Sequence, residues 1–252
     1  MNTLIARLNA VASTPPPWSL AAALVAVAAA FAFIIVGTLV GGAWFGDPAN
    51  PLPPFAQLVG WLIAAVLAAL YVLQTRRAAA DREALRLAPG GTPLALVLFV
   101  AFGLAIAIDL VALILTSGTF VSTPALLPLA PFGNGAGLRE WAVAVVLLVI
   151  AQPVSEGLVF RGVLLPSLRS ALSGLPGIVA QGVVCGVFHF LAYTPAYPEG
   201  GIVVWVYGLV VPLLAGVIFG GVRVLTGSTR AAMFAQAAFG LFALAKHIII
   251  IT

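Results

Sequence analysis

Four ionisable side chains lie within strongly apolar stretches of the sequence, where a charge is costly: Asp109, Glu156, Arg161 and His189. Glu156 and His189 are the pair with the clearest chemical use. A carboxylate and an imidazole from neighbouring segments can activate a water molecule, with one of them acting as general base. Gln236 is a fifth, uncharged candidate. The residue types alone favour a plainer alternative, in which a buried Glu–Arg or Glu–His pair only fixes the positions of helices.

Two other polar positions have both a structural and a functional interpretation. Asp109 is interpreted as a structural hydrogen-bond partner in preference to a proton site. His247, beside Lys246, is interpreted as an ordinary interfacial histidine in preference to a ligand of a metal or pigment. The single cysteine, Cys185, excludes an intrachain disulfide. The sequence has no C-x-x-C motif or Cys/His cluster of the kind that binds zinc, so we expect no metal and no cofactor.

The composition indicates an integral membrane protein. Of 252 residues, 63% are hydrophobic and 7% are charged, whereas soluble domains carry about 25% charged residues. Each membrane span needs about 20 mostly apolar residues. The sequence therefore predicts an all-α, polytopic transmembrane helical bundle of about seven spans. The net charge of +4 comes from short loops beside apolar runs, which favours membrane orientation over nucleic-acid binding as its explanation.

Apolar runs and their boundaries divide the chain into three parts. We expect a cytoplasmic lead at residues 1–17, N-terminal spans and loops at 18–135, and a core at 136–252. The predicted spans are 18–45, 55–75, 92–116, 139–165, 172–193, 201–224 and 229–251.

Basic residues predict the orientation of the bundle. One side holds eight of them, namely Arg7, Arg76, Arg77, Arg82, Arg86, Arg169, Arg223 and Arg230, and the other side holds Arg139 and Lys246. The basic side is expected to be cytoplasmic. The N-terminus then lies inside and the C-terminus outside, in what we expect to be a bacterial plasma membrane.

The predicted spans also give a depth for each candidate residue. Glu156 lies about 17 residues into the fourth span, toward the cytoplasmic half at about 1.5 Å per residue. Pro153 precedes it and should kink the helix there. His189 fits less well, because the predicted boundaries of the fifth span put it beyond the midplane. The two side chains can meet only if the fifth span sits deeper than these boundaries imply.

Three Gly-x-x-x-Gly pairs indicate close helix packing: Gly37/Gly41, Gly182/Gly186 and Gly216/Gly220. Small residues four apart allow helices to approach closely in lipid. We favour packing inside the bundle over a seam between two copies of the chain.

The segment 153–164 resembles a known motif. Its sequence, Pro-Val-Ser-Glu-Gly-Leu-Val-Phe-Arg-Gly-Val-Leu, is similar to the first motif of the CAAX protease and bacteriocin-processing (CPBP) family, also called the Abi family, of intramembrane proteases. That motif is Glu-Glu-x-x-x-Arg, commonly followed by Gly. Glu156 matches the first Glu and Arg161 matches the Arg, whereas Gly157 stands at the position of the second Glu.

Two weaker motifs follow in the family's order and spacing. The family's Phe-x-x-x-His is matched at His189, with Cys185 at the position of the Phe. The family's His-x-x-x-Asn (or Asp) falls on Gln236 and Gly240. The resemblance extends over residues 140–245 and implies an intramembrane peptidase core.

The resemblance also implies roles for individual residues. Glu156 would be the base, His189 its partner in activating water, and Arg161 an electrostatic support. Gln236 would occupy a degenerate oxyanion position. The family's pocket lies within the membrane and opens toward the cytoplasm, and it works without a metal.

The departures from the family motifs predict weak catalysis. Gln236 can donate a hydrogen bond but cannot carry a proton, and Gly240 has no side chain to donate. Losing one oxyanion donor typically costs ~10²–10³ in rate.

We therefore expect a CPBP-like membrane protein that is catalytically weak or silent and serves as an accessory or scaffold subunit. The alternative is an active intramembrane endopeptidase. A transporter is less favoured, because matching broken helices that would mark a midplane site are not seen in the sequence. The expected partners are the lipid bilayer, other membrane proteins of a larger complex and, if the chain is active, a peptide substrate. Nucleic acid is not expected.

Overall fold

The computed structural model describes residues 4–10, 15–123, 126, 137–193 and 200–251. Seven of its helical segments are long and apolar enough to cross a membrane. The described residues form helices and connecting turns, without a strand among them. The predicted all-α bundle of about seven spans is confirmed.

Four spans are continuous helices: α2 (Leu20–Phe45), α3 (Pro54–Thr75), α5 (Leu94–Leu115) and α9 (Gly174–Tyr193). A fifth, α12, covers Thr229–Ile251. The fourth span consists of α6 (Leu138–Val145), η1 (Val146–Ala151), α7 (Gln152–Glu156), η2 (Gly157–Leu164) and α8 (Leu165–Leu172). The sixth consists of α10 (Gly201–Trp205), η3 (Val206–Val210) and α11 (Val211–Thr226). Two short helices, α1 (Leu4–Asn9) and α4 (Ala79–Leu85), lie outside the spans.

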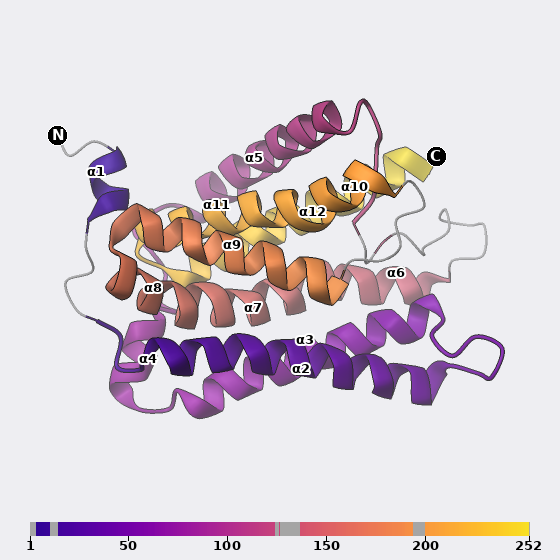
Figure 1. Ribbon diagram of the computed structural model, residues 1–252, viewed down its shortest axis with the longest axis horizontal. Helices are drawn as coiled ribbons and strands as arrows, with labels where there is room; N and C mark the ends of the chain where they lie inside the picture. Colours follow the sequence, from indigo (N-terminus) through magenta and orange to yellow (C-terminus); the bar gives the residue numbers. More distant parts are fainter. Residues whose placement is uncertain (1–3, 11–14, 124–125, 127–136, 194–199, 252) are drawn as a thin grey trace.

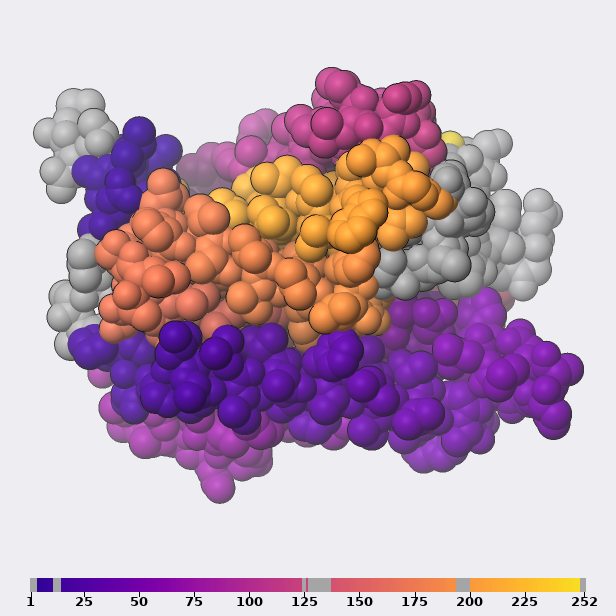
Figure 2. All heavy atoms as spheres, viewed as in Figure 1, coloured from indigo at the N-terminus to yellow at the C-terminus, as the bar shows by residue number. Residues whose placement is uncertain are grey.

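The spans are arranged with a central group flanked on two sides (Figure 1). The hairpin of α2 and α3 runs along one edge of the bundle, and α5 runs along the opposite edge, where it packs against α12 and α11. Figure 2 shows the atoms of α5 as a raised ridge along that edge. The fourth span, α9 and α12 lie between these edges and carry the candidate site residues.

Close glycine contacts hold the α2–α3 hairpin together. A Cβ atom added to Gly37 would clash with the carbonyl oxygen of Gly60, and one added to Gly41 would clash with that of Ala56. The Gly182/Gly186 pair of α9 packs in the same way against α11, where Leu213 is a shared neighbour. These glycines are used inside the bundle, as the sequence interpretation favoured.

The fourth span contains two π-helical stretches, each between α-helical segments. The η1 and η2 segments are π-helical, a form that is rare and frequently found at functional sites. Pro153 is the second residue of α7, directly after η1. Its missing amide therefore falls where the register changes. The π-helical turns rotate the side chains that follow and so determine which face of the span Glu156 and Arg161 occupy.

The turn between the fourth and fifth spans sets the depth of the site. The predicted end of the fourth span at residue 165 is wrong, because the span continues to Leu172 and only Ser173, at φ 67°, separates it from α9. Glu156 is sixteen residues before Leu172, and His189 is fifteen residues after Gly174. Both residues therefore lie at the same level, and the predicted depth of His189 is corrected.

The basic side of the bundle yields a prediction about orientation. Helices α1, α4 and α8 lie at one end of the bundle, and the last turn of α12 lies at the other (Figure 1). We predict that the end with α1, α4 and α8 faces the cytoplasm. In a Cys185→Ala background, an impermeant thiol reagent applied to intact cells should label Ala49→Cys, in the α2–α3 turn, but not Ala80→Cys. Both positions are exposed.

Permeabilised cells are the control, because both cysteines should then react. Labelling of position 80 but not 49 in intact cells would invert the topology.

Candidate functional site

The carboxylate of Glu156 is buried at the centre of the site. The residue is 4% exposed. Its Oε1 accepts a hydrogen bond from the Gln152 amide at 2.8 Å and lies 3.4 Å from Nε2 of His189. Its Oε2 accepts a hydrogen bond from the Gln236 amide at 2.7 Å. The structure thus brings together side chains from α7, α9 and α12 that the sequence singled out, and both carboxylate oxygens already have donors.

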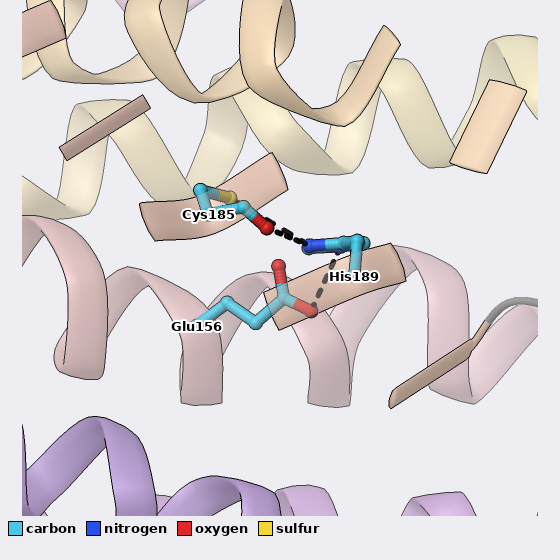
Figure 3. A group of neighbouring side chains, drawn as sticks. All are labelled: Glu156, Cys185 and His189. Atoms are coloured by element: carbon cyan, nitrogen blue, oxygen red, sulfur yellow. Dashed lines mark hydrogen bonds and ion pairs between the residues drawn. The ribbon is translucent and has the colours of Figure 1, made fainter. Parts of the chain in front are cut away.

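Hydrogen bonding fixes the ring of His189. Its Nδ1 lies 2.9 Å from the carbonyl oxygen of Cys185, four residues earlier on α9 (Figure 3). A carbonyl only accepts, so Nδ1 carries a proton and Nε2 faces Glu156. A neutral Nε2 would present a lone pair to a carboxylate. The contact is therefore favourable only when the Glu156–His189 pair holds a further proton, on the ring or on the carboxyl group.

Arg161 is 1% exposed and reaches Glu156 indirectly. Its Nη1 donates to Oε1 of Gln236 at 3.0 Å, and its Nη2 lies 3.8 Å from Sγ of Cys185. The guanidinium carbon lies 4.9 Å from the ring centroid of Phe219. A direct Glu156–Arg161 ion pair, which the sequence left open, is not among the ion pairs of the described residues. The amide of Gln236 instead bridges the two charges.

Neighbouring atoms fill the space beside the two glycines of the degenerate motifs. A Cβ atom at Gly157 would clash with the side chain of Met233. A Cβ atom at Gly240 would clash with the carbonyl oxygen of Leu148 in η1. Met233 is a flexible side chain, whereas the Leu148 carbonyl belongs to the backbone. A side chain at Gly240 would therefore meet the backbone of η1, which packs directly against α12 at this point, although Gly240 also borders a cavity that extends toward α5.

A cavity of about 210 Å³ extends from the site toward α5. Gln152, His189 and Gln236 line one end of it, and Asp109 and Lys246 line the other. The residues between these ends are mainly apolar side chains of α5, η1, η3, α11 and α12. Glu156 borders a separate cavity of about 10 Å³, which is roughly the space of one water molecule. The amide and imidazole groups thus stand between the carboxylate and the larger cavity.

Asp109 and His247 have partners that the sequence did not suggest. Asp109 forms an ion pair with Lys246 and so joins α5 to α12. His247 is 2% exposed, and its Nδ1 lies 2.5 Å from the hydroxyl oxygen of Ser122. The structural role expected of Asp109 agrees with its ion pair. His247 is buried within the protein, where Trp141 packs against its ring, and its position at the membrane interface stays a prediction.

Cys185 is a member of the site to which the sequence assigned no chemical role. Cys185 and His189 are four residues apart on a helix, a spacing that puts both on one face. With Glu156 they offer oxygen, sulfur and nitrogen atoms within 4.8 Å of one another (Figure 3), a donor set that zinc accepts. A dication there would displace the amides bound to Glu156 and stand beside the guanidinium of Arg161. We therefore interpret the cluster as a hydrogen-bonded network.

Comparison with known protein families agrees with the motifs. Residues 138–242 match the family model described as type II CAAX prenyl endopeptidase Rce1-like. The match covers less than half of the chain and includes every residue of the site. It confirms the resemblance to CAAX proteases. Searches of curated proteins and of solved structures return no match.

The bridging position of Gln236 leads to a prediction about stability. Gln236→Met keeps the volume of the side chain but removes both hydrogen bonds, so that Glu156 and Arg161 each lose a partner. Because unsatisfied buried polar groups are costly, the variant should lose about 2 kcal/mol or more of stability. Thermal unfolding in mild detergent measures this loss. Gln74→Met, at an exposed position of α3, is the matched control, and equal midpoints for the two variants would contradict the bridging role.

The donor set leads to a prediction about metal. The purified chain should carry far less than one zinc ion per molecule by elemental mass spectrometry. An excess of chelator should leave its unfolding midpoint unchanged, because Glu156 and Cys185 already accept hydrogen bonds and Nε2 of His189 faces Glu156. About one zinc per chain in the wild type, lost in Cys185→Ala and in His189→Ala, would show that the cluster is a metal site.

Proposed function

We propose that this CAAX-protease-like membrane protein is catalytically weak or silent and serves as an accessory or scaffold subunit of a membrane complex. The premise is the match of residues 138–242 to that family. The observation that carries the proposal is the packing at Gly240, where the backbone of η1 takes the space that an oxyanion donor would need. Preorganised donors to the oxyanion are usually the largest contribution to catalysis of acyl transfer.

The state of Glu156 supports the same proposal. A general base must reach the water that it activates. Here one carboxylate oxygen is bound by Gln236, and the other is bound by Gln152 and faces His189. The larger cavity ends at these amides and at His189, so a peptide in that cavity would meet amide and imidazole groups before the carboxylate. The arrangement suits a buried charge that holds three helices together.

An active, metal-independent intramembrane endopeptidase is the second candidate. It is favoured by the 3.4 Å separation of Glu156 and His189, the two groups that the family uses to activate water. In this mechanism Glu156 would take a proton from water. That proton would then be shared between the Glu156 carboxyl group and the His189 ring. Arg161 would act on Glu156 through Gln236. Activity would require the Gln152 and Gln236 amides to move away from the carboxylate.

Peptide hydrolysis by the purified chain separates the two candidates. On a membrane-presented peptide, the wild type and Glu156→Ala should both give the background rate. Turnover near ~1 s⁻¹, within the usual enzyme range, that disappears in Glu156→Ala would contradict the silent subunit. The subunit proposal also predicts that the chain purifies in mild detergent with fixed partners, and that Glu156→Ala weakens this association. A solitary, fully stable monomer would count against it.

The packing at Gly240 has its own test. Gly240→Ala should cost about 1–3 kcal/mol of stability, because overpacking forces the η1 backbone to shift. Gly103→Ala is the matched control, since Gly103 lies in α5 with nothing within 4 Å of an added Cβ. It should be neutral or slightly stabilising, as Ala is the better helix former. A neutral Gly240→Ala would mean that the site has room for the missing donor.

A further inference from the structure

A second cavity, of about 500 Å³, lies at the end of the bundle that carries α1, α4 and α8. Four arginines line it, and each comes from a different element. They are Arg7 of α1, Arg86 at the C-terminal cap of α4, Arg169 of α8 and Arg223 of α11. Much of the remaining wall is apolar: Pro15, Pro16, Pro17, Leu165, Pro166 and Val224. We call this cavity, defined by its four arginines, the arginine cleft.

The arginines of the cleft are not neutralised by acidic side chains. None of the ion pairs among the described residues includes any of the four. Glu83 is the acidic residue among those that line the cleft, and it forms none of these ion pairs. Arg86 and Arg169 repel one another, and both repel Arg223. Gathering like charges raises the free energy of the folded state, and a bound anion would reverse this effect.

Hydrogen bonds hold the guanidinium groups of Arg223 and Arg7 in place. Arg223 is 7% exposed, and its Nε donates to the Thr229 hydroxyl at 2.7 Å. Its Nη2 lies 3.4 Å from the carbonyl oxygen of Ala84. One Nη2 donor of Arg7 binds the carbonyl oxygen of Leu225 at 2.9 Å. These two side chains are therefore held in place before any ligand arrives, which reduces the entropy lost on binding.

The same side chains still have donors to offer. A guanidinium has five N–H donors and no acceptor. Arg169 uses Nη2 to bind the carbonyl oxygen of Ala10, while its Nε is buried without a hydrogen-bond partner. Arg223 and Arg7 each bind only one or two acceptors. Convergent, partly unused guanidinium groups match the oxygen atoms of a phosphate, which arginine binds through paired hydrogen bonds.

We propose that the arginine cleft binds a phosphate group. Its volume exceeds that of a bare phosphate, and its proline and leucine wall suits an attached organic part. Basic pockets between helices at the membrane surface bind the headgroups of anionic lipids. An anionic phospholipid of the adjacent leaflet and a soluble phosphate share this chemistry, and they are separated by experiment. The proposal does not depend on whether the Glu156 site is active.

Thermal unfolding of the full-length chain in detergent tests the proposal. Phosphatidylglycerol is compared with phosphatidylcholine, and sodium phosphate is compared with sodium chloride at equal ionic strength. Phosphatidylglycerol should raise the midpoint of the wild type by about 3–6 °C more than phosphatidylcholine does. In Arg86→Gln/Arg169→Gln the increment should fall below about 1 °C, because the loss of charged hydrogen bonds weakens binding at least about tenfold. The buried Arg223 is retained in this variant so that the fold is preserved.

Arg77→Gln/Arg82→Gln is the matched control. It removes the same number of positive charges from exposed positions between α3 and α5 that do not line the cleft. This variant should keep the wild-type increment. The increment is compared within each variant, so a small loss of stability does not affect the result. An increment with sodium phosphate alone, lost in the cleft variant only, would support the site and identify a soluble source. Equal increments in the two double variants, or no increment with either phosphate source, would overturn the proposal.

Discussion

The burial of the Glu156 carboxylate is the constraint on which the core of this bundle depends. A charge in a medium of low dielectric constant is tolerated only when its oxygens are hydrogen-bonded and its charge is balanced. Gln152 supplies one amide from the preceding turn, and Gln236 supplies another from α12. Arg161 balances the charge through Gln236, and His189 closes the remaining side. The fourth span, α9 and α12 are therefore joined by polar contacts that cannot be removed singly without leaving a buried group unsatisfied.

Satisfying the carboxylate and using it for catalysis are opposed requirements. A base in a hydrolase must exchange hydrogen bonds with water and substrate during each turnover. Here the amides bind the carboxylate from within the protein, and Gln236 is held in turn by Arg161. An imidazole at position 236 could give and take a proton, whereas the amide can only fix its neighbours. Gln236 therefore suits a position that holds its neighbours rigidly.

The sequence predicted the membrane-spanning helices better than the turns and contacts between them. Hydropathy located all seven spans, because a bilayer requires long apolar runs. The motif residues Glu156, Arg161, His189 and Gln236 proved to be neighbours; their residue types suggested the Glu–His and Glu–Arg pairs, and the family resemblance connected Gln236 to them. Three features were not predicted: one turn, one ion pair and one packing contact. The turn between the fourth and fifth spans is a single residue, Ser173, directly before Gly174, and the predicted end of the fourth span at residue 165 came too early. The Asp109–Lys246 pair joins residues 137 positions apart. The packing of Leu148 on Gly240 depends on the π-helical register of η1, and the hydropathy of the sequence does not reveal this register.

The single-residue turn at Ser173 has a consequence for how such chains are recognised. In an antiparallel hairpin with so short a connection, residues at equal distance from the turn lie at the same level. The interval between Glu156 and His189 is therefore dictated by the geometry of the hairpin, whatever the two residues do. Adding one residue to α9 before His189 would rotate its ring by about 100° around the helix and away from the carboxylate. A sequence motif that relies on the number of residues between Glu156 and His189 therefore detects a helical hairpin with a polar pair along its length. It would detect a scaffold and an enzyme equally well, so the chemistry of such a chain has to be read from the atoms around the pair.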